Sequence, residues 1–239
     1  MRFKAFITLL LGMFLAGAAL AQAVQTPAAP PAPQPENVLL LDLSTGGRVA
    51  IQLRPDVAPG HVARIKTLAR RGFYNGLTFH RVIDGFMAQG GDPKGDGTGG
   101  SDLPDLKAEF NALPHVRGAI AGARTENPDT ANSQFFIMLA PKLALDGRYT
   151  VFGRVISGMP FVDQIEKGEP PANPTRILQA SIAADGKAPP SPEAVAAARA
   201  ATASRAVILP AGRSAGPAMP PPPQIRQPEP PAPKQKKKQ

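Results

Sequence analysis

The sequence predicts a mainly β domain, a closed antiparallel barrel whose ends are covered by two helices. Many short apolar stretches alternate with turn residues, and only two segments between residues 37 and 186 show a helical pattern of apolar positions. The 239-residue chain has no cysteine, so a packed core rather than disulfides must stabilise the fold. Periodicity alone also allows a β-sandwich.

Residues 1–23 predict a signal peptide, although a buried core helix is the structural alternative. Two basic residues precede an apolar run too short to span a bilayer comfortably, and small residues form two A-x-A patterns. Cleavage would follow Ala21 or Ala23. We therefore expect export to the periplasm, with no transmembrane span after cleavage. Residues 24–36 are rich in alanine and proline and predict an extended linker.

The patterned sequence begins at Asn37 and opens with a hairpin. Strands are predicted at 38–43 and 48–53, where apolar and polar residues alternate along the second strand. An amphipathic helix begins near Pro59 and ends at Gly72. Six further strands are predicted at 77–82, 86–90, 118–123, 134–139, 151–156 and 176–183, and a second helix at 160–167 that stops at Gly168.

Residues 187–239 form a tail with a different composition. Ser191 and Pro192 are typical of a helix start, which predicts a helix over 194–206. The tail holds 13 prolines and few large apolar side chains, so the rest is predicted to be largely disordered. Its basic end suggests weak contact with anionic envelope surfaces; the alternative is an inert solubilising tail.

The formal net charge of +9 does not predict nucleic-acid binding. Residues 1–23 carry +2 and residues 187–239 carry +7, so residues 24–186 are neutral overall. A nucleic-acid-binding domain would carry its basic patch within the fold. We therefore expect no nucleic-acid partner.

A glycine-rich segment and the three histidines are interpreted as structural features rather than as binding sites. Gly95–Gly100 matches the dinucleotide pattern G-x-G-x-x-G, but both flanks predict loop rather than strand and helix. His61, His80 and His115 are scattered, with no carboxylate at ligand spacing, so we expect no metal site, and we expect a hydrogen-bonded His80 inside the barrel. No cofactor is predicted.

The functional prediction rests on six short sequence motifs that follow one another along the chain, here called the ordered phrases. They are Phe79-His80-Arg81, Gly85-Phe86-Met87-Ala88-Gln89-Gly90-Gly91-Asp92, Gly97-Thr98-Gly99-Gly100, Ser133-Gln134-Phe135-Phe136-Ile137, Leu145-Asp146-Gly147 and Val151-Phe152-Gly153. Together they resemble the cyclophilins, a family of peptidyl-prolyl cis–trans isomerases, from about residue 38 to residue 183. The resemblance implies a cyclophilin-like, closed eight-stranded antiparallel β-barrel capped by two α-helices, and an isomerase domain at 37–186.

The resemblance also implies roles for individual residues. Arg81 would be catalytic, with Gln89 beside it. The substrate-binding residues would be Phe86, Met87, Phe136 and Leu145 in the proline pocket, Gln134, Arg124 and Thr125 along the peptide, Gly97 at the rim of a neighbouring subsite, and Tyr149. Phe79, Phe135 and Phe152 are instead expected in the core.

Some positions depart from the better-known eukaryotic pattern. Ala144 stands where that pattern has tryptophan, and Tyr149 where it has histidine. Arg124-Thr125 stands where that pattern has Ala-Asn, and in this respect the sequence resembles bacterial members of the family. The missing indole implies weaker cyclosporin binding, whereas the catalytic arginine is intact.

The resulting hypothesis is a periplasmic isomerase of X-Pro bonds that acts on unfolded or newly exported polypeptides and assists their folding. We expect a monomer without metal or cofactor. Two other hypotheses remain open at this point. One is a peptide-binding chaperone in which isomerisation is incidental. The other is an envelope structural protein that works through its proline-rich tail.

Overall fold

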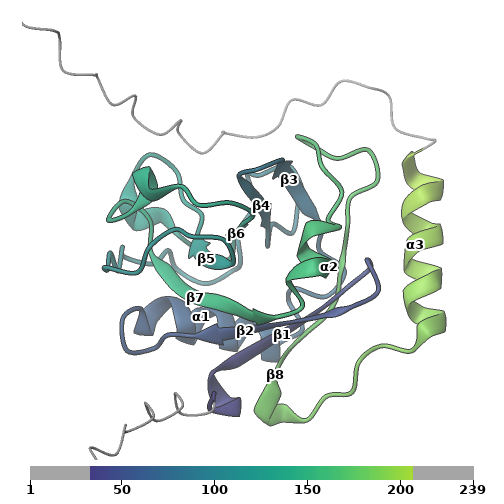
Figure 1. Cartoon of the computed structure of the whole chain (residues 1–239), viewed down its shortest axis with the longest axis horizontal. Helices are drawn as coiled ribbons and strands as arrows, with labels where there is room; N and C mark the ends of the chain where they lie inside the picture. The colour runs from purple at the N-terminus through teal and green to yellow at the C-terminus, as the bar shows by residue number, and fades with distance from the viewer. Residues whose placement is uncertain (1–32, 207–239) are drawn as a thin grey trace, which may run out of the picture. The chain divides into compact units, whose positions relative to one another are not determined.

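Eight strands form one antiparallel sheet in the computed structural model, which describes residues 33–206 (Figure 1). The strand order is β3-β4-β6-β5-β7-β2-β1-β8. Each strand overlaps one predicted from the sequence, so the mainly β prediction is confirmed. The bounds are β1 Val38–Leu43, β2 Arg48–Leu53, β3 Phe79–Ile83, β4 Met87–Gly90, β5 Ala119–Gly122, β6 Phe135–Met138, β7 Val151–Ser157 and β8 Ile177–Ile182.

The prediction of a closed barrel is wrong, because the sheet curls but stays open between its edge strands β3 and β8. An isolated bridge between Thr78 and Arg176, and a hydrogen bond from the Phe79 amide to the Thr175 carbonyl (2.9 Å), join the two edges. The segment that leads into β8 contains three prolines at 170, 171 and 174. Proline has no amide hydrogen to donate, so this segment cannot form a continuous ladder along β3.

Three α-helices accompany the sheet within residues 33–206. Helix α1 (Pro59–Arg70) ends just before Gly72, as predicted, and packs against β8. Helix α2 (Met159–Asp163) is shorter than the predicted 160–167. It ends early because the chain must then turn to pair Gly168 with Val82 of β3.

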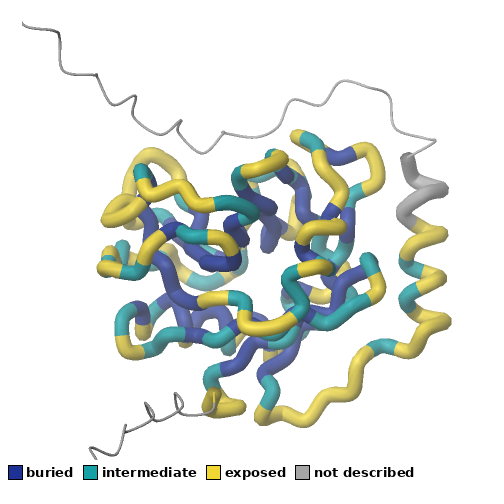
Figure 2. Tube along the Cα trace, in the orientation of Figure 1, coloured by how far each residue is buried: buried dark blue, intermediate teal, exposed yellow. Residues whose placement is uncertain are grey.

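Helix α3 (Pro192–Ala206) confirms the helix predicted in the tail. The Ser191 hydroxyl accepts a hydrogen bond from the Ala194 amide (3.2 Å), which caps the helix start. Its described side chains are mostly exposed (Figure 2). Within residues 33–206, no helix is long and apolar enough to cross a membrane. The predicted signal peptide and the end of the tail lie outside the described residues.

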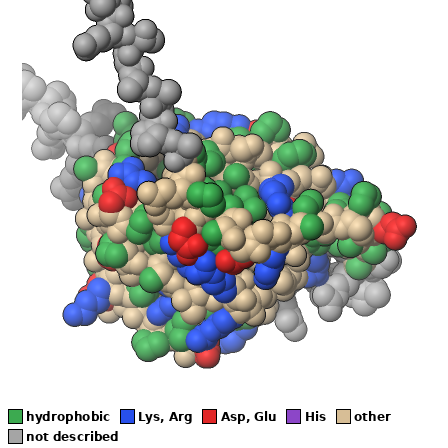
Figure 3. All heavy atoms as spheres, turned by 90° about the horizontal axis from the view of Figure 1, so that it is seen from below, with side chains coloured by type: hydrophobic (Ala, Val, Ile, Leu, Met, Phe, Trp, Pro, Cys, Tyr) green, Lys and Arg blue, Asp and Glu red, His purple; other side chains and the backbone are tan. Residues whose placement is uncertain are grey.

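The core fills the concave side of the sheet and is closed by α1. Phe79, Phe135 and Phe152 lie in this inner cluster with almost no exposed surface, which confirms their predicted core position. Val62, Ile65 and Leu68 of α1 pack onto the same cluster. On the face shown in Figure 3, basic, acidic and apolar side chains are interspersed, consistent with the neutral charge of the folded region.

A carboxylate–histidine pair, in which only the histidine is fully buried, fixes the start of α1. Glu109 accepts hydrogen bonds from the amides of Gly60 (2.8 Å) and His61 (2.9 Å), and its carboxylate lies 2.6 Å from Nδ1 of His61. The carboxylate therefore satisfies amides that the helix leaves unpaired and interacts favourably with the helix dipole. These contacts hold the long connection between β4 and β5 against the helix.

All three histidines are buried, and burial lowers the pKa of each of them. Contacts with Glu109 and Asp146 oppose this effect on the pKa of His61 and of His115, without reversing it. A lowered pKa means that the unfolded chain binds the proton more tightly than the folded one. The histidine contribution to stability is thus complete above a pH of about 6.5 and falls as the pH drops below it.

We therefore predict that the free energy of unfolding decreases between pH 7.5 and pH 5. Each histidine that stays neutral in the folded state adds a slope of up to about 1.4 kcal/mol per pH unit. Thermal or urea unfolding across this range measures the slope, and a His80→Asn variant should show a shallower one. A stability that is constant from pH 7.5 to pH 5 would contradict the assignment.

Candidate active site

A β-bulge in β3 brings Arg81 to the convex face of the sheet. Phe79 pairs with Gly90 and Arg81 pairs with Gln89, so His80 is an extra residue on β3. Without it, strict alternation would place Arg81 on the same face as Phe79, in the core. With the bulge, Phe79 and Val82 point into the inner cluster, and Arg81 points away from it.

Arg81 begins a row of paired residues that crosses the sheet. Arg81 pairs with Gln89 of β4, Gln89 with Phe136 of β6, and Phe136 with Ala121 of β5. Paired residues in neighbouring strands point to the same face. The ladder therefore sets a guanidinium, an amide and a phenyl ring side by side, although they are far apart in the sequence.

An outer apolar cluster lies at the far end of this row. The Phe136 ring is fully buried, packs edge-on against Tyr149 at 5.6 Å between ring centroids, and stacks on His115 at 6.2 Å. The His115 ring is fixed by Asp146, whose carboxylate lies 2.8 Å from Nδ1. The cluster also holds Met87, Ala119, Ala121, Ala123, Met138, Leu145 and Val151, with Phe86 packed at its margin.

A groove of about 440 Å³ lies along the other side of the row. Its lining includes Gln89, predicted beside the catalytic arginine, and four predicted binding residues, Gly97, Arg124, Thr125 and Gln134. Gln134 holds its two walls together, because its Nε2 donates to the carbonyls of Gly97 (2.9 Å) and Gly99 (2.8 Å), while its Oε1 accepts from Gln89 (2.9 Å). The groove is thus built on side-chain amides.

The glycine-rich wall of the groove folds around a buried carboxylate. Asp92, only 1% exposed, accepts hydrogen bonds from the amides of Lys94 (2.8 Å), Asp96 (3.1 Å) and Gly97 (2.5 Å). Gly97 has φ of +88°, which favours glycine at this turn. The segment is a loop, as predicted, so its glycine pattern has a structural explanation.

Arg124 and Tyr149 close the opposite wall. The Arg124 guanidinium lies 4.4 Å from the centre of the Tyr149 ring and donates to the carbonyls of Thr125 (2.8 Å) and Arg148 (2.8 Å). Burial raises the pKa of the Tyr149 phenol, and the charge of Arg124 opposes this shift. The phenol therefore stays protonated at neutral pH.

The predicted site residues fall into two adjoining groups. Gln89, Gly97, Arg124, Thr125 and Gln134 line the groove, whereas Met87, Phe136, Leu145 and Tyr149 are buried in the outer cluster beside it. Arg81 pairs with Gln89 of the groove lining.

The Arg81 side chain is only 12% exposed, and its Nε donates to Glu169 (2.7 Å). The expectation of a hydrogen-bonded His80 is wrong. His80 is buried as predicted, but neither ring nitrogen has a partner among the described residues. As the bulged residue, it lies where the ladder is interrupted.

Sequence reasoning missed four residues that shape the site: Glu169, Asp92, His115 and Asn132. Asn132 accepts from the Ser101 amide (2.9 Å) and donates to the Leu103 carbonyl (2.9 Å), which fixes the loop beyond the groove. Asp92 closes one of the ordered phrases, which is the only local signal among the four. The others act on residues that are distant in the sequence.

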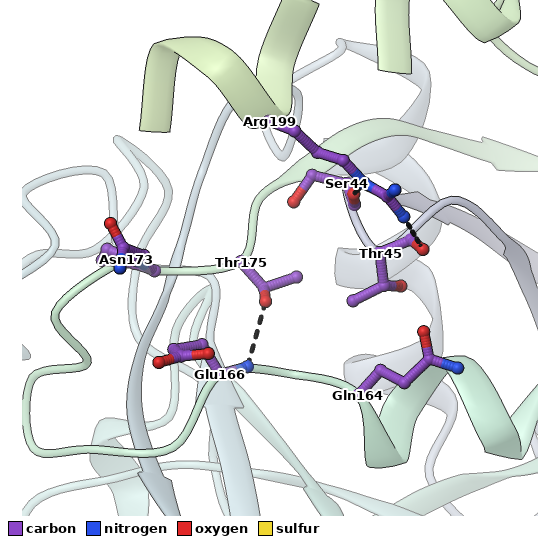
Figure 4. Close-up of a pocket in the computed structure, with 8 residues that line it drawn as sticks. Ser44, Thr45, Gln164, Glu166, Asn173, Thr175 and Arg199 are labelled. Carbon is purple, nitrogen blue, oxygen red and sulfur yellow. Dashed lines mark hydrogen bonds between the residues drawn. The ribbon is translucent and has the colours of Figure 1, made fainter. Parts of the chain in front are cut away.

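A second pocket, of about 260 Å³, contains no predicted site residue (Figure 4). Arg199 of α3 reaches over its rim and donates to the carbonyls of Ser44 (2.6 Å) and Thr45. Thr175 accepts from the Glu166 amide on the opposite side (3.1 Å). Among residues 33–206, no group of three or more His, Cys, Asp or Glu is placed to hold a metal ion.

Comparison with known proteins identifies the family. Residues 40–182 match the model of the family described as cyclophilin type peptidyl-prolyl cis-trans isomerase/CLD. The chain belongs to this family. It is a peptidyl-prolyl cis–trans isomerase, an enzyme whose substrates are proline-containing polypeptides.

Individual relatives agree with this assignment. A probable peptidyl-prolyl cis-trans isomerase of Brucella suis is 52% identical over 181 residues, covering 69% of this chain and 90% of the relative. Peptidyl-prolyl cis-trans isomerase B of Bacillus subtilis is 46% identical over 129 residues, covering 53% of this chain and 89% of the relative.

Solved cyclophilin structures share the fold. A cyclophilin from Hirschia baltica superposes with a TM-score of 0.60 at 29% identity, covering 65% of this chain and 77% of that one. One from Cryptosporidium parvum, crystallised in the presence of the dipeptide Ala-Pro, gives a TM-score of 0.57 at 28% identity, covering 61% and 98%.

Phe136→Ala should impair both stability and activity. The ring is fully buried against Tyr149 and His115, so its removal should lower the free energy of unfolding by about 3–5 kcal/mol. It should also lower kcat/KM, because the apolar surface beside Gln89 is lost. Urea unfolding and a protease-coupled isomerase assay measure the two effects.

The milder Phe136→Leu variant keeps most of the apolar volume and serves as the control, with a smaller loss of stability expected. A stable Phe136→Ala protein with full activity would remove Phe136 from the proposed pocket.

Proposed function

We propose that Arg81, supported by Gln89, catalyses rotation about X-Pro bonds of unfolded or newly exported polypeptides in the periplasm, and so assists their folding. The catalytic part of this proposal rests on one observation, the row of Arg81, Gln89 and Phe136 across three paired strands. The export part rests on the basic and apolar pattern of residues 1–23.

The reaction needs little chemical machinery. Rotation about an X-Pro bond has a barrier of about 20 kcal/mol because resonance stiffens the amide, whereas the two isomers differ by only about 0.5–1 kcal/mol. The proline nitrogen regains its lone pair in the twisted transition state and becomes a better hydrogen-bond acceptor. A donor that contacts the twisted amide more strongly than the planar one therefore lowers the barrier.

Arg81 meets this requirement. A guanidinium stays protonated and presents several rigid N–H donors. Its Nη1 is buried and has no hydrogen-bond partner among the described residues, so a donor is available in a site of low exposure. The buried Oε1 of Gln89 likewise lacks a partner and offers an acceptor beside it.

The outer cluster supports binding of the proline ring. Met87, Phe136 and Leu145 present apolar side chains on the face that carries Arg81 and Gln89. Apolar surroundings exclude water and strengthen the hydrogen bonds made by the arginine. The amide-lined groove on the other side would hold the polypeptide that flanks the proline.

Arg81→Ala should reduce kcat/KM by about 10²–10³, which is typical of the loss of one preorganised transition-state donor. The protein should remain folded, because Arg81 lies outside the inner core. A protease-coupled assay with a proline-containing tetrapeptide measures the effect, and circular dichroism checks the fold.

Arg81→Lys is the matched control, since it keeps the charge but loses the planar set of donors. We expect activity between those of the wild type and Arg81→Ala. Near-normal activity of a folded Arg81→Ala protein would refute the catalytic role.

Export is tested separately by fusing residues 1–36 to alkaline phosphatase, which needs disulfides and is active only in an oxidising compartment. The fusion should be active, and a fusion of residues 24–36 alone should be inactive. An inactive 1–36 fusion would contradict the export proposal and leave the catalytic one intact.

A further inference from the structure

The Arg81 side chain has a partner that lies 88 residues further along the chain. Its Nε donates to Oε2 of Glu169 at 2.7 Å. The glutamate belongs to the irregular segment between α2 and β8, and its side chain is 45% exposed, against 12% for Arg81. No other carboxylate forms an ion pair with Arg81 in the described part of the chain.

The backbone sets this pair in register. Gly168 and Val82 exchange two hydrogen bonds, from the Val82 amide (2.8 Å) and from the Gly168 amide (2.9 Å). In an antiparallel pair centred on these two residues, Glu169 falls opposite Arg81. Glu169 therefore extends the row of Arg81, Gln89 and Phe136 by one position beyond β3.

Two further features fix the segment that carries Glu169. Lys167 forms an ion pair with Asp84 at 2.6 Å, on the other side of the Gly168–Val82 pair. Gly168 has φ of +143°, and a Cβ there would lie 2.7 Å from Cα of Pro171. Glycine is thus required at the point where the segment turns back on itself.

The contact at Nε leaves the other end of the guanidinium for the substrate. Because the group is planar, a hydrogen bond at Nε fixes the directions of all its N–H bonds. The Nη1 group, which is buried and has no hydrogen-bond partner among the described residues, then keeps a fixed direction. A proline nitrogen is a much weaker acceptor than a carboxylate, so it would not displace Glu169 from Nε during turnover.

We propose that Glu169 is a positioning residue that orients the Arg81 guanidinium for transition-state contact. The inference rests on the proposed catalytic role of Arg81. Glu169 touches the arginine and not the substrate, so its loss should lower kcat more than it raises KM. The pair is partly exposed and contributes little to overall stability, so variants should fold.

The experiment compares Glu169→Ala, Glu169→Gln and Arg81→Ala in the full chain, with Lys167→Ala as the matched control. Lys167→Ala removes the neighbouring ion pair of the same segment but leaves Glu169 in place. We expect Glu169→Ala to lower kcat by about 10- to 100-fold with KM changed less than about twofold, as for a misoriented catalytic group. Glu169→Gln, which retains an acceptor of the same shape, should fall between it and the wild type, and Lys167→Ala should match the wild type.

Nuclear magnetic resonance of the arginine Nε–H groups gives a second readout. The wild type should show a slowly exchanging Nε–H signal that disappears in Arg81→Ala. The same signal should be lost or exchange rapidly in Glu169→Ala while the backbone amide spectrum stays dispersed. If Glu169→Ala does not fold, the kcat and Nε–H signal of Glu169→Gln decide the question.

The outcomes separate the two proposals. Unchanged or increased activity of the Glu169 variants, with an inactive Arg81→Ala, would overturn the positioning role and leave the catalytic arginine in place; an increase would mean that Glu169 competes with substrate. A loss of activity in Lys167→Ala equal to that in Glu169→Ala would also overturn it, since the cause would then be a loosened segment. An active Arg81→Ala protein would refute the proposed catalysis itself.

Discussion

The single extra residue in β3 places the core residues and the proposed site residues of this strand on opposite faces of the sheet. His80 shifts the alternation of side chains, so that Phe79 and Val82 face the inner core while Arg81 faces outward. A strand without the bulge would bury the guanidinium among aromatic rings, where an unpaired charge is very costly. The row from Arg81 to Phe136, the groove beside Gln89 and the contact with Glu169 all depend on this shift in register.

The strands on either side of the bulge serve both faces at once. In β6, Phe135 and Ile137 belong to the inner cluster, whereas Phe136 and Met138 belong to the outer one. A side chain of the proposed site is therefore held by a backbone whose neighbouring residues are core. The free-energy cost of reorganising such a site in the transition state is small, because its groups are already in place.

Sequence reasoning predicted much of the fold, and it failed where distant residues decide the structure. Alternation and turn residues located all eight strands, and the ordered phrases identified the family, because both signals are local. The end of α2 was misplaced, since it depends on the pairing of Gly168 with Val82. The barrel was expected to close, but the prolines that precede β8 prevent a continuous ladder with β3.

The predicted site shows the same division. Local phrases named Arg81, Gln89, Gln134 and Phe136, and the structure brings them together. No local pattern reveals the bulge, because the sequence Phe79-His80-Arg81-Val82 is compatible with both a regular and a bulged strand. The pairing with β4 decides between the two. Glu169 could not be predicted from the sequence either. Its contact with Arg81 depends on the register in which Gly168 pairs with Val82, two residues that are far apart in the sequence. In the proposed arrangement Glu169, on an irregular segment, orients the Arg81 guanidinium. The backbone hydrogen bonds that hold this segment, between Gly168 and Val82, are then part of the proposed active site.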